Sequence, residues 1–115
     1  MPWNVQVSDQ VQAFLQGLTE VELTKVVSFI ELLEEYGPHL KRPHADSLSG
    51  SRHPNMKELR IKCSTKEFRI LFAFDPKQSG VLLFGGDKVP MGERRWYPKA
   101  IANADDAYDD HLSSL

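Results

Sequence analysis

Residues 57–88, KELRIKCSTKEFRILFAFDPKQSGVLLFGGDK, carry the clearest structural pattern of the chain. Hydrophobic residues recur in it at a period of two or in short runs, as is typical of buried strands. We predict three strands from it, Lys57–Cys63, Glu67–Asp75 and Val81–Lys88. The connections between them are short and polar, which favours an antiparallel meander.

The same alternation assigns each charged side chain to a face of the sheet. Arg60 and Lys62 share one face of the first strand, and Arg69 lies opposite the Phe-rich face of the second. If the Phe-rich face packs against helices, the three cations gather on the far side. Like charges held close are unfavourable unless an anion lies among them, so the pattern suggests a phosphate site. The alternative is that acidic neighbours neutralise these cations; the candidates are Glu58, Glu67 and Asp87.

A short strand and a helical hairpin are predicted before this stretch. Residues 3–7 alternate between apolar and polar side chains. Ser8 can cap a first helix, Thr19 opens a capping box for a second, and Gly37 ends that helix. Residues 38–56 have no periodic pattern and are predicted to form a long loop.

A terminal helix is predicted to begin at Pro98, because proline suits a first helical turn. The order of elements is therefore βααβββα. With the helices packed on one face of an antiparallel sheet, residues 1–115 form a single small α+β domain.

Composition narrows the class of protein. Of 115 residues, 41% are hydrophobic and 26% charged, which excludes disordered and fibrous classes. The apolar runs are far shorter than the roughly 18 residues of a membrane span. We expect a protein that is not exported, since no basic segment followed by an apolar one opens the given sequence. Since Cys63 is the single cysteine, we expect a cytoplasmic protein without a disulfide. The spacing of His39, His44 and His53 matches no compact metal site, so no metal is expected. We also predict no cofactor.

The net charge of −2 is distributed unevenly along the chain. Residues 37–99 carry thirteen Lys and Arg against six Asp and Glu, whereas residues 1–36 and 100–115 are acidic. Local potential governs association with charged partners more than the total charge does. The basic middle therefore permits nucleic-acid binding; the alternative is three solvated faces whose charges happen to segregate.

Three motifs together resemble the RelE/HigB superfamily of type II toxins, and most of all its phage-related HigB-like branch. They are MKELRIK at 56–62, FRILFAF at 68–74 and GDK at 86–88. The pair Trp96-Tyr97, before a last helix rich in Ala and Asp, is also similar to that branch. The resemblance covers nearly the whole chain and implies a small RelE-like domain.

The resemblance implies an mRNA endoribonuclease that acts on message at the ribosome. It also implies a cognate antitoxin, a HigA-like helix-turn-helix protein. The candidate catalytic positions carried over from it are Arg60, Lys62, Arg69, Lys88 and Tyr97. Further candidates for RNA contact are Lys57, His53, Arg94, Arg95 and Trp96.

Cleavage of RNA through its own 2′-hydroxyl needs a base, stabilisation of the phosphate and an acid for the leaving oxygen. Lys62 is the candidate base, because neighbouring guanidinium groups disfavour its charged form. Arg69 suits bidentate phosphate binding. Tyr97 could donate a proton or stack on a base, and Trp96 could stack on a base. For both residues, packing against the last helix is the alternative. His53 is either an acid–base group beside the strand or an exposed loop residue.

Two other functions fit the same pattern. One is a ParE-like inhibitor of DNA gyrase, which shares the fold and kills by binding. The other is an RNA- or protein-binding domain of the same fold that has no catalytic activity. Basic residues borne on strands favour the ribonuclease.

Overall fold

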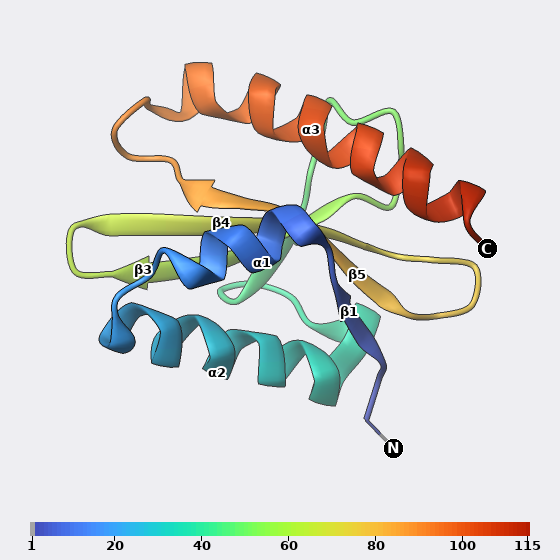
Figure 1. Ribbon diagram of the computed structural model, residues 1–115, viewed down its shortest axis with the longest axis horizontal. Helices are drawn as coiled ribbons and strands as arrows, with labels where there is room; N and C mark the ends of the chain where they lie inside the picture. The colour runs from blue at the N-terminus through green and yellow to red at the C-terminus, as the bar shows by residue number, and fades with distance from the viewer. Residues whose placement is uncertain (1) are drawn as a thin grey trace.

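The chain follows the predicted order of elements, with one strand and one short 3₁₀ turn added (Figure 1). The computed structural model describes residues 2–115. The elements are β1 (Val5–Val7), α1 (Asp9–Gln16), α2 (Glu20–Tyr36), η1 (Gly37–His39), β2 (Ala45–Ser47), β3 (Lys57–Cys63), β4 (Lys66–Phe74), β5 (Gly80–Asp87) and α3 (Glu93–Ser113). This arrangement confirms the α+β class.

The five strands form one mixed sheet in the order β1-β5-β4-β3-β2. The predicted meander β3-β4-β5 is antiparallel throughout, whereas β1 pairs parallel with β5, Val5 lying opposite Gly80. The expectation of a wholly antiparallel sheet is therefore wrong at this edge. The reason is topological: β1 adds to the free edge of β5, a pairing between residues some 75 positions apart that no local pattern reveals.

Residues 38–56, predicted as a loop, contain the edge strand β2. Its three residues pair antiparallel with β3, Ala45 lying opposite Leu59. A strand of this length shows no recognisable alternation, and its partner residues on β3 lie ten or more positions away in the sequence. The strand carries the preceding segment, which includes Arg42, to the edge of the sheet.

The two N-terminal helices begin and end where the sequence predicts. Ser8 caps α1 by accepting a hydrogen bond from the Val11 amide, and Thr19 forms a complete capping box with Glu22. Gly37 ends α2 with φ +58°, a conformation that disfavours residues with a Cβ atom. A Cβ atom there would also lie 2.4 Å from the Trp3 indole.

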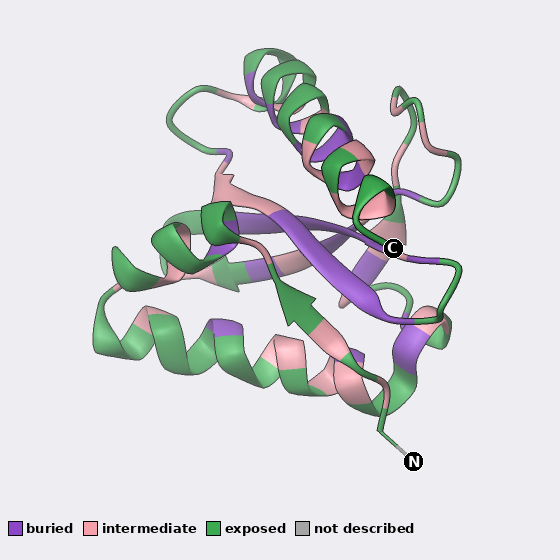
Figure 2. Cartoon of the chain, turned by 45° about the vertical axis from the view of Figure 1, so that its right-hand side comes forward, coloured by how far each residue is buried: buried purple, intermediate pink, exposed green. Residues whose placement is uncertain are grey.

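The helices cover both faces of the sheet, not one (Figures 1 and 2). The hairpin α1–α2 packs on one face, and α3 packs on the other; buried residues on the two faces form separate clusters. The α3 side of the sheet includes Leu71, Ala73, Val81 and Leu83. The expectation that all helices pack on one face of the sheet is wrong, because β4 and β5 are apolar on both faces and both faces must be covered.

Helix α3 begins at Glu93, five residues earlier than predicted, and Pro98 lies inside it. The additional turn is held by Trp96, which is 7% exposed and packs against Gly86 and Phe84. Burial of this indole outweighs the one helical hydrogen bond that proline removes. Tyr97 consequently projects from a helix toward the sheet.

Candidate functional site

A cavity of about 300 Å³ lies on the sheet face opposite the helical hairpin. Its lining residues are Arg42, Pro43, Arg60, Lys62, Glu67 and Arg69. The structure thus brings Arg60, Lys62 and Arg69 together, and it adds Arg42 from the segment before β2. We call this the cationic cavity.

The strand register brings the guanidinium groups close together. Arg60 lies directly opposite Arg69 in the β3–β4 pair, and Lys62 lies opposite Glu67. Like charges in directly opposed positions destabilise a sheet unless something compensates them. Most of the compensating negative charge comes from Glu58, which lies two residues before Arg60 on β3.

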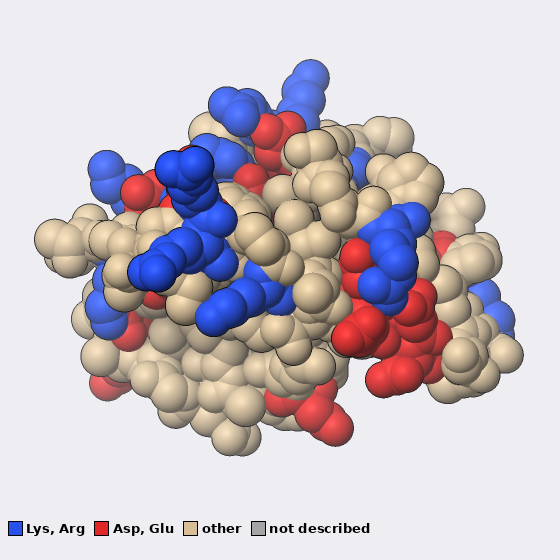
Figure 3. Space-filling view, turned by 90° about the horizontal axis from the view of Figure 1, so that it is seen from above, with Lys and Arg blue, Asp and Glu red and all other residues tan. Residues whose placement is uncertain are grey.

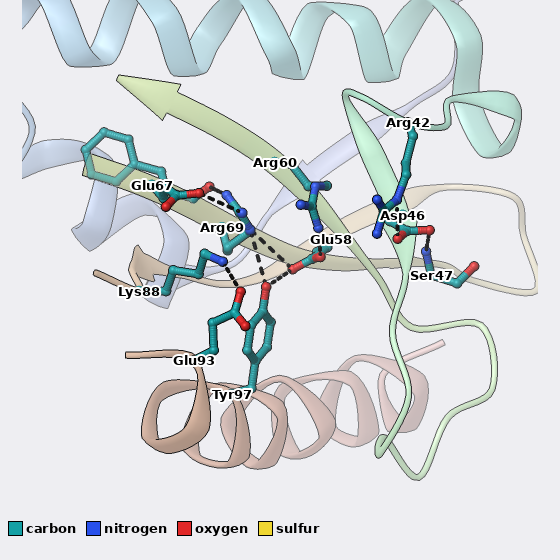
Figure 4. Close-up of polar contacts among 11 residues, drawn as sticks. Arg42, Asp46, Ser47, Glu58, Arg60, Glu67, Arg69, Lys88, Glu93 and Tyr97 are labelled. Carbon is teal, nitrogen blue, oxygen red and sulfur yellow. Dashed lines mark hydrogen bonds and ion pairs between the residues drawn. The ribbon is translucent and has the colours of Figure 1, made fainter. Parts of the chain in front are cut away.

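Glu58 is the centre of the polar network in Figure 4. The residue is only 3% exposed, and its carboxylate accepts hydrogen bonds from Arg60 Nη1 at 2.9 Å and from Tyr97 Oη at 2.6 Å. Arg69 Nε lies 3.6 Å from the same carboxylate. The alternative from the sequence, that acidic neighbours neutralise the cations, therefore holds for Arg60 and Arg69. Glu58 also connects both cations to α3.

Arg69 is buried, with 3% of its surface exposed, and every nitrogen of its guanidinium has a protein partner. Nη1 donates to the Phe68 carbonyl at 3.0 Å, Nη2 to Glu67 at 3.3 Å, and Nε to the Tyr97 hydroxyl at 3.3 Å. A buried guanidinium must satisfy its donors within the protein. The expectation of a bidentate grip on phosphate by Arg69 is therefore wrong for this conformation; its charge contributes to the potential of the cavity.

Lys62 differs from the arginines around it. Its side chain is exposed, and among residues 2–115 no carboxylate pairs with it. Arg42 is also exposed and pairs with Asp46 at 2.8 Å, while Arg60 is partly exposed. Four cations thus face three carboxylates, those of Asp46, Glu58 and Glu67. One positive charge is uncompensated, and Lys62 carries it.

The Tyr97 side chain extends from α3 toward the residues of the cationic cavity. Burial raises the pKa of its hydroxyl to about 12, and the adjacent Glu58 carboxylate acts in the same direction. The phenol is therefore neutral at physiological pH, keeps its proton and donates a hydrogen bond to Glu58. Lys88 lies behind it, with Nζ 5.9 Å from the Tyr97 ring centroid and paired with Glu93. This ammonium group lowers the pKa of Glu93, mainly through their hydrogen bond.

The candidate RNA contacts are dispersed. Arg94 and Arg95 are exposed in the first turn of α3, outside the lining of the cavity. Trp96 is in the core, so its expected role as a stacking platform is wrong. It is a packing residue, but as a member of α3 it packs against Phe84 and Gly86 of β5 and not against the last helix. Lys57 lies on the hairpin face and donates to the Pro38 carbonyl at 3.0 Å, with the sheet between it and Arg60.

His53 lies away from the cationic cavity, beside the C-terminal half of α3. Its Nε2 atom is 2.8 Å from Asp109, and its ring packs edge-on against Tyr108 at 4.7 Å between centroids. With 18% of its side chain exposed, it is neither a free loop residue nor a member of the site. Figure 3 shows basic side chains over one end of the α3 side and acidic ones toward the other.

Arg42 and the central role of Glu58 were not predicted. Arg42 belongs to a segment without periodicity, so nothing in the sequence relates it to β3. Glu58 alternates in phase with Arg60, which offered a signal, but only burial distinguishes a central carboxylate from a surface partner. Among residues 2–115, the helices contain no apolar segment of the length that a transmembrane helix needs.

Comparison with known proteins gives one family model and two relatives named as putative toxins. The model of the phage-derived Gp49-like family (DUF891) matches residues 13–109. Putative toxin HigB2 of Mycobacterium tuberculosis is 41% identical over 114 residues, which cover 98% of this chain and 56% of HigB2. Putative toxin HigB3 of the same organism is 41% identical over 105 residues, which cover 91% of this chain and 90% of HigB3. The chain thus spans little more than half the length of HigB2.

Solved structures share the fold. A chain of the archaeal RelE–RelB complex from Pyrococcus horikoshii OT3 has a TM-score of 0.57 at 20% identity, covering 77% of this chain and 98% of that one. A mutant of E. coli toxin RelE in the free state has a TM-score of 0.62 at 12% identity, covering 89% and 96%. The chain therefore belongs to the phage-derived Gp49-like family within the RelE/HigB superfamily.

Proposed function

We propose that this protein is the toxin of a type II toxin–antitoxin pair and that it cleaves mRNA at the ribosome in the cationic cavity. The observation that carries the proposal is the convergence of four cations on one cavity with a positive charge left uncompensated. A phosphodiester is the anion that such a group of donors suits. The relatives named as putative toxins and the RelE fold support the same function.

In the proposed reaction the uncharged amine form of Lys62 takes the proton of the 2′-hydroxyl and becomes the ammonium form. Among the exposed lysines and arginines of the cavity, Lys62 is assigned this role because no carboxylate within residues 2–115 pairs with it and so favours the charged form. The 2′-oxygen attacks phosphorus, the bond to the 5′-oxygen breaks, and a 2′,3′-cyclic phosphate and a 5′-hydroxyl form. Arg60 and Arg42 stabilise the added negative charge, and buried Arg69 adds a fixed potential. The leaving oxygen takes a proton from Tyr97, whose hydroxyl gives up its hydrogen bond to Glu58.

The proposed partner is a cognate antitoxin, a HigA-like helix-turn-helix protein. Its support is the fold shared with a chain of a RelE–RelB complex. An antitoxin that covers the cationic cavity with acidic groups would neutralise the charge of Lys62. Co-expression of such a partner is expected to restore the growth of cells that produce this protein.

The test is inducible expression followed by mapping of RNA 5′ ends, with and without blocked translation. Wild type is expected to arrest growth and to create new 5′ ends that depend on translation. Lys62→Ala is expected to lower cleavage at least 100-fold, within the range attributed to general-base catalysis. Lys77→Ala, an exposed lysine in the β4–β5 turn, is the matched control and should cleave like wild type.

Three results would contradict the proposal. Growth arrest with intact message and broken DNA would indicate a gyrase inhibitor. Absence of arrest and of new 5′ ends would indicate a binding domain without catalytic activity. Full cleavage by folded Lys62→Ala protein would exclude the assigned base.

A further inference from the structure

A second cavity, larger than the first at about 550 Å³, opens between α3 and the segment before β3. Its lining residues are Ser49, Gly50, Arg52, Tyr97, Pro98, Ile101, Ala102 and Asp105. Its walls are mainly the apolar surfaces of Pro98, Ile101 and Ala102. We call it the α3 cavity.

Tyr97 connects the two cavities. The side chain lines the α3 cavity, and its hydroxyl bonds Glu58 and Arg69, of which Arg69 lines the cationic cavity. A ligand with an anionic group beside Lys62 would therefore extend along the Tyr97 side chain to reach the α3 cavity. Figure 4 shows Tyr97 rising from α3 to the strands that carry the cations.

The charges around the α3 cavity disfavour a second phosphate there. Arg52 is already paired with Asp106 at 3.2 Å and with Asp109, and its amide donates to Asp105 at 3.0 Å. Three carboxylates thus surround one guanidinium, so the rim is negative. An uncharged, flat and largely apolar group suits this cavity better than an anion.

We propose that the α3 cavity binds the nucleobase next to the phosphate held in the cationic cavity. The inference rests on the proposed RNA substrate. The Tyr97 ring and the Pro98 and Ile101 side chains supply apolar contact for a base. Asp105, whose oxygens accept from Ser51 and the Arg52 amide, keeps further acceptor capacity. A base with an exocyclic amino group is therefore preferred over uracil.

The experiment is NMR titration of ¹⁵N-labelled protein with adenosine 3′-monophosphate, uridine 3′-monophosphate and inorganic phosphate. The adenosine nucleotide is expected to shift amides at Gly50 and Ala102 as well as at Lys62, and inorganic phosphate only those near Lys62. The uridine nucleotide is expected to bind at least threefold more weakly than the adenosine one.

Ala102→Trp fills the cavity from an exposed position of α3, and Asn103→Trp, one residue further along and outside the cavity, is the matched control. Ala102→Trp is expected to weaken nucleotide binding at least tenfold and to leave phosphate binding unchanged. Ala102→Phe repeats the test with a smaller ring, and circular dichroism checks folding of all three variants.

Nucleotide shifts confined to the cationic cavity, or unchanged affinity in the folded Ala102 variants, would overturn the inference. The inference would also be overturned if the Ala102 variants kept the nucleotide affinity of wild type but were no longer neutralised by the antitoxin. The α3 cavity would then be assigned to a protein segment. If wild-type protein binds the nucleotide in this cavity but cleaves no RNA, the proposed function fails and the base site stands.

Discussion

Replacing Glu58 by Gln tests the central feature of the candidate site. Glu58 is 3% exposed, and its carboxylate compensates two guanidinium groups, one of which belongs to the equally buried Arg69. Removing one member of a buried ion pair costs about 3–5 kcal/mol, because the other charge is left uncompensated. Arg69 keeps a second partner in Glu67, which places the expected loss near the lower limit, about 3 kcal/mol. For a chain of this size, that corresponds to a melting temperature lower by roughly 10 °C.

The measurement is urea and thermal unfolding of wild type, Glu58→Gln and the matched control Glu67→Gln. Glu67 pairs with the same Arg69, but its side chain is 40% exposed, so solvent screens the pair and the expected loss is below about 1 kcal/mol. A second measurement of Glu58→Gln is the pKa of Tyr97 by NMR. It should fall below about 12 and stay above 10, since burial remains while the neighbouring charge is gone.

Equal losses of stability in the two glutamine variants would refute the reasoning, because burial would then have no effect on the strength of the pairs. A loss below about 1 kcal/mol in Glu58→Gln would refute it as well. An unchanged pKa of Tyr97 would show that its hydroxyl does not face the Glu58 carboxylate.

Two further predictions concern the scaffold. Gly37→Ala is expected to cost about 2–3 kcal/mol in urea unfolding, because it combines a φ of +58° with a Cβ position 2.4 Å from Trp3. Gly17→Ala should not destabilise, because a Cβ atom there would make only ordinary contacts, 3.7 Å from the Phe14 carbonyl oxygen, and similar losses at both glycines would count against the reasoning. Burial raises the pKa of Asp75, but hydrogen bonds from His111 and from backbone amides hold it below the ordinary 3.8 overall. The ionised carboxylate therefore stabilises the protein above that value, and this contribution is lost as the pH falls through the folded-state pKa. The urea midpoint of Asp75→Asn should vary less between pH 5 and pH 2 than that of wild type, and parallel profiles would contradict the expectation.

Local patterns predicted most of the elements. The alternation in 57–88 located β3, β4 and β5, and the caps at Ser8 and Thr19 located the hairpin. Both signals arise between residues close in sequence. The strand β2 and the start of α3 were missed, because a three-residue strand has no period and the first turn of α3 depends on burial of Trp96.

The candidate site was predicted in part. The period of two predicted that Arg60, Lys62 and Arg69 share a face, since alternate residues of a strand must do so. The sequence could not show that Arg42 joins them, because that contact depends on the pairing of β2 with β3. The parts played by Lys62 and Tyr97 in RNA cleavage stay predictions.

Which side chains alternate, where helices begin and end, and how charge is divided along the chain were all readable from the order of residues, because each depends on neighbours a few positions apart. Which cations of the cationic cavity are buried and paired, and that Lys62 has no carboxylate partner within residues 2–115, depends on the tertiary structure, in which α3 covers the second face of the sheet. That helix brings Tyr97 to Glu58 and, through it, to Arg69. Burial changes the energetics of a charge, and burial is a property of the assembled chain.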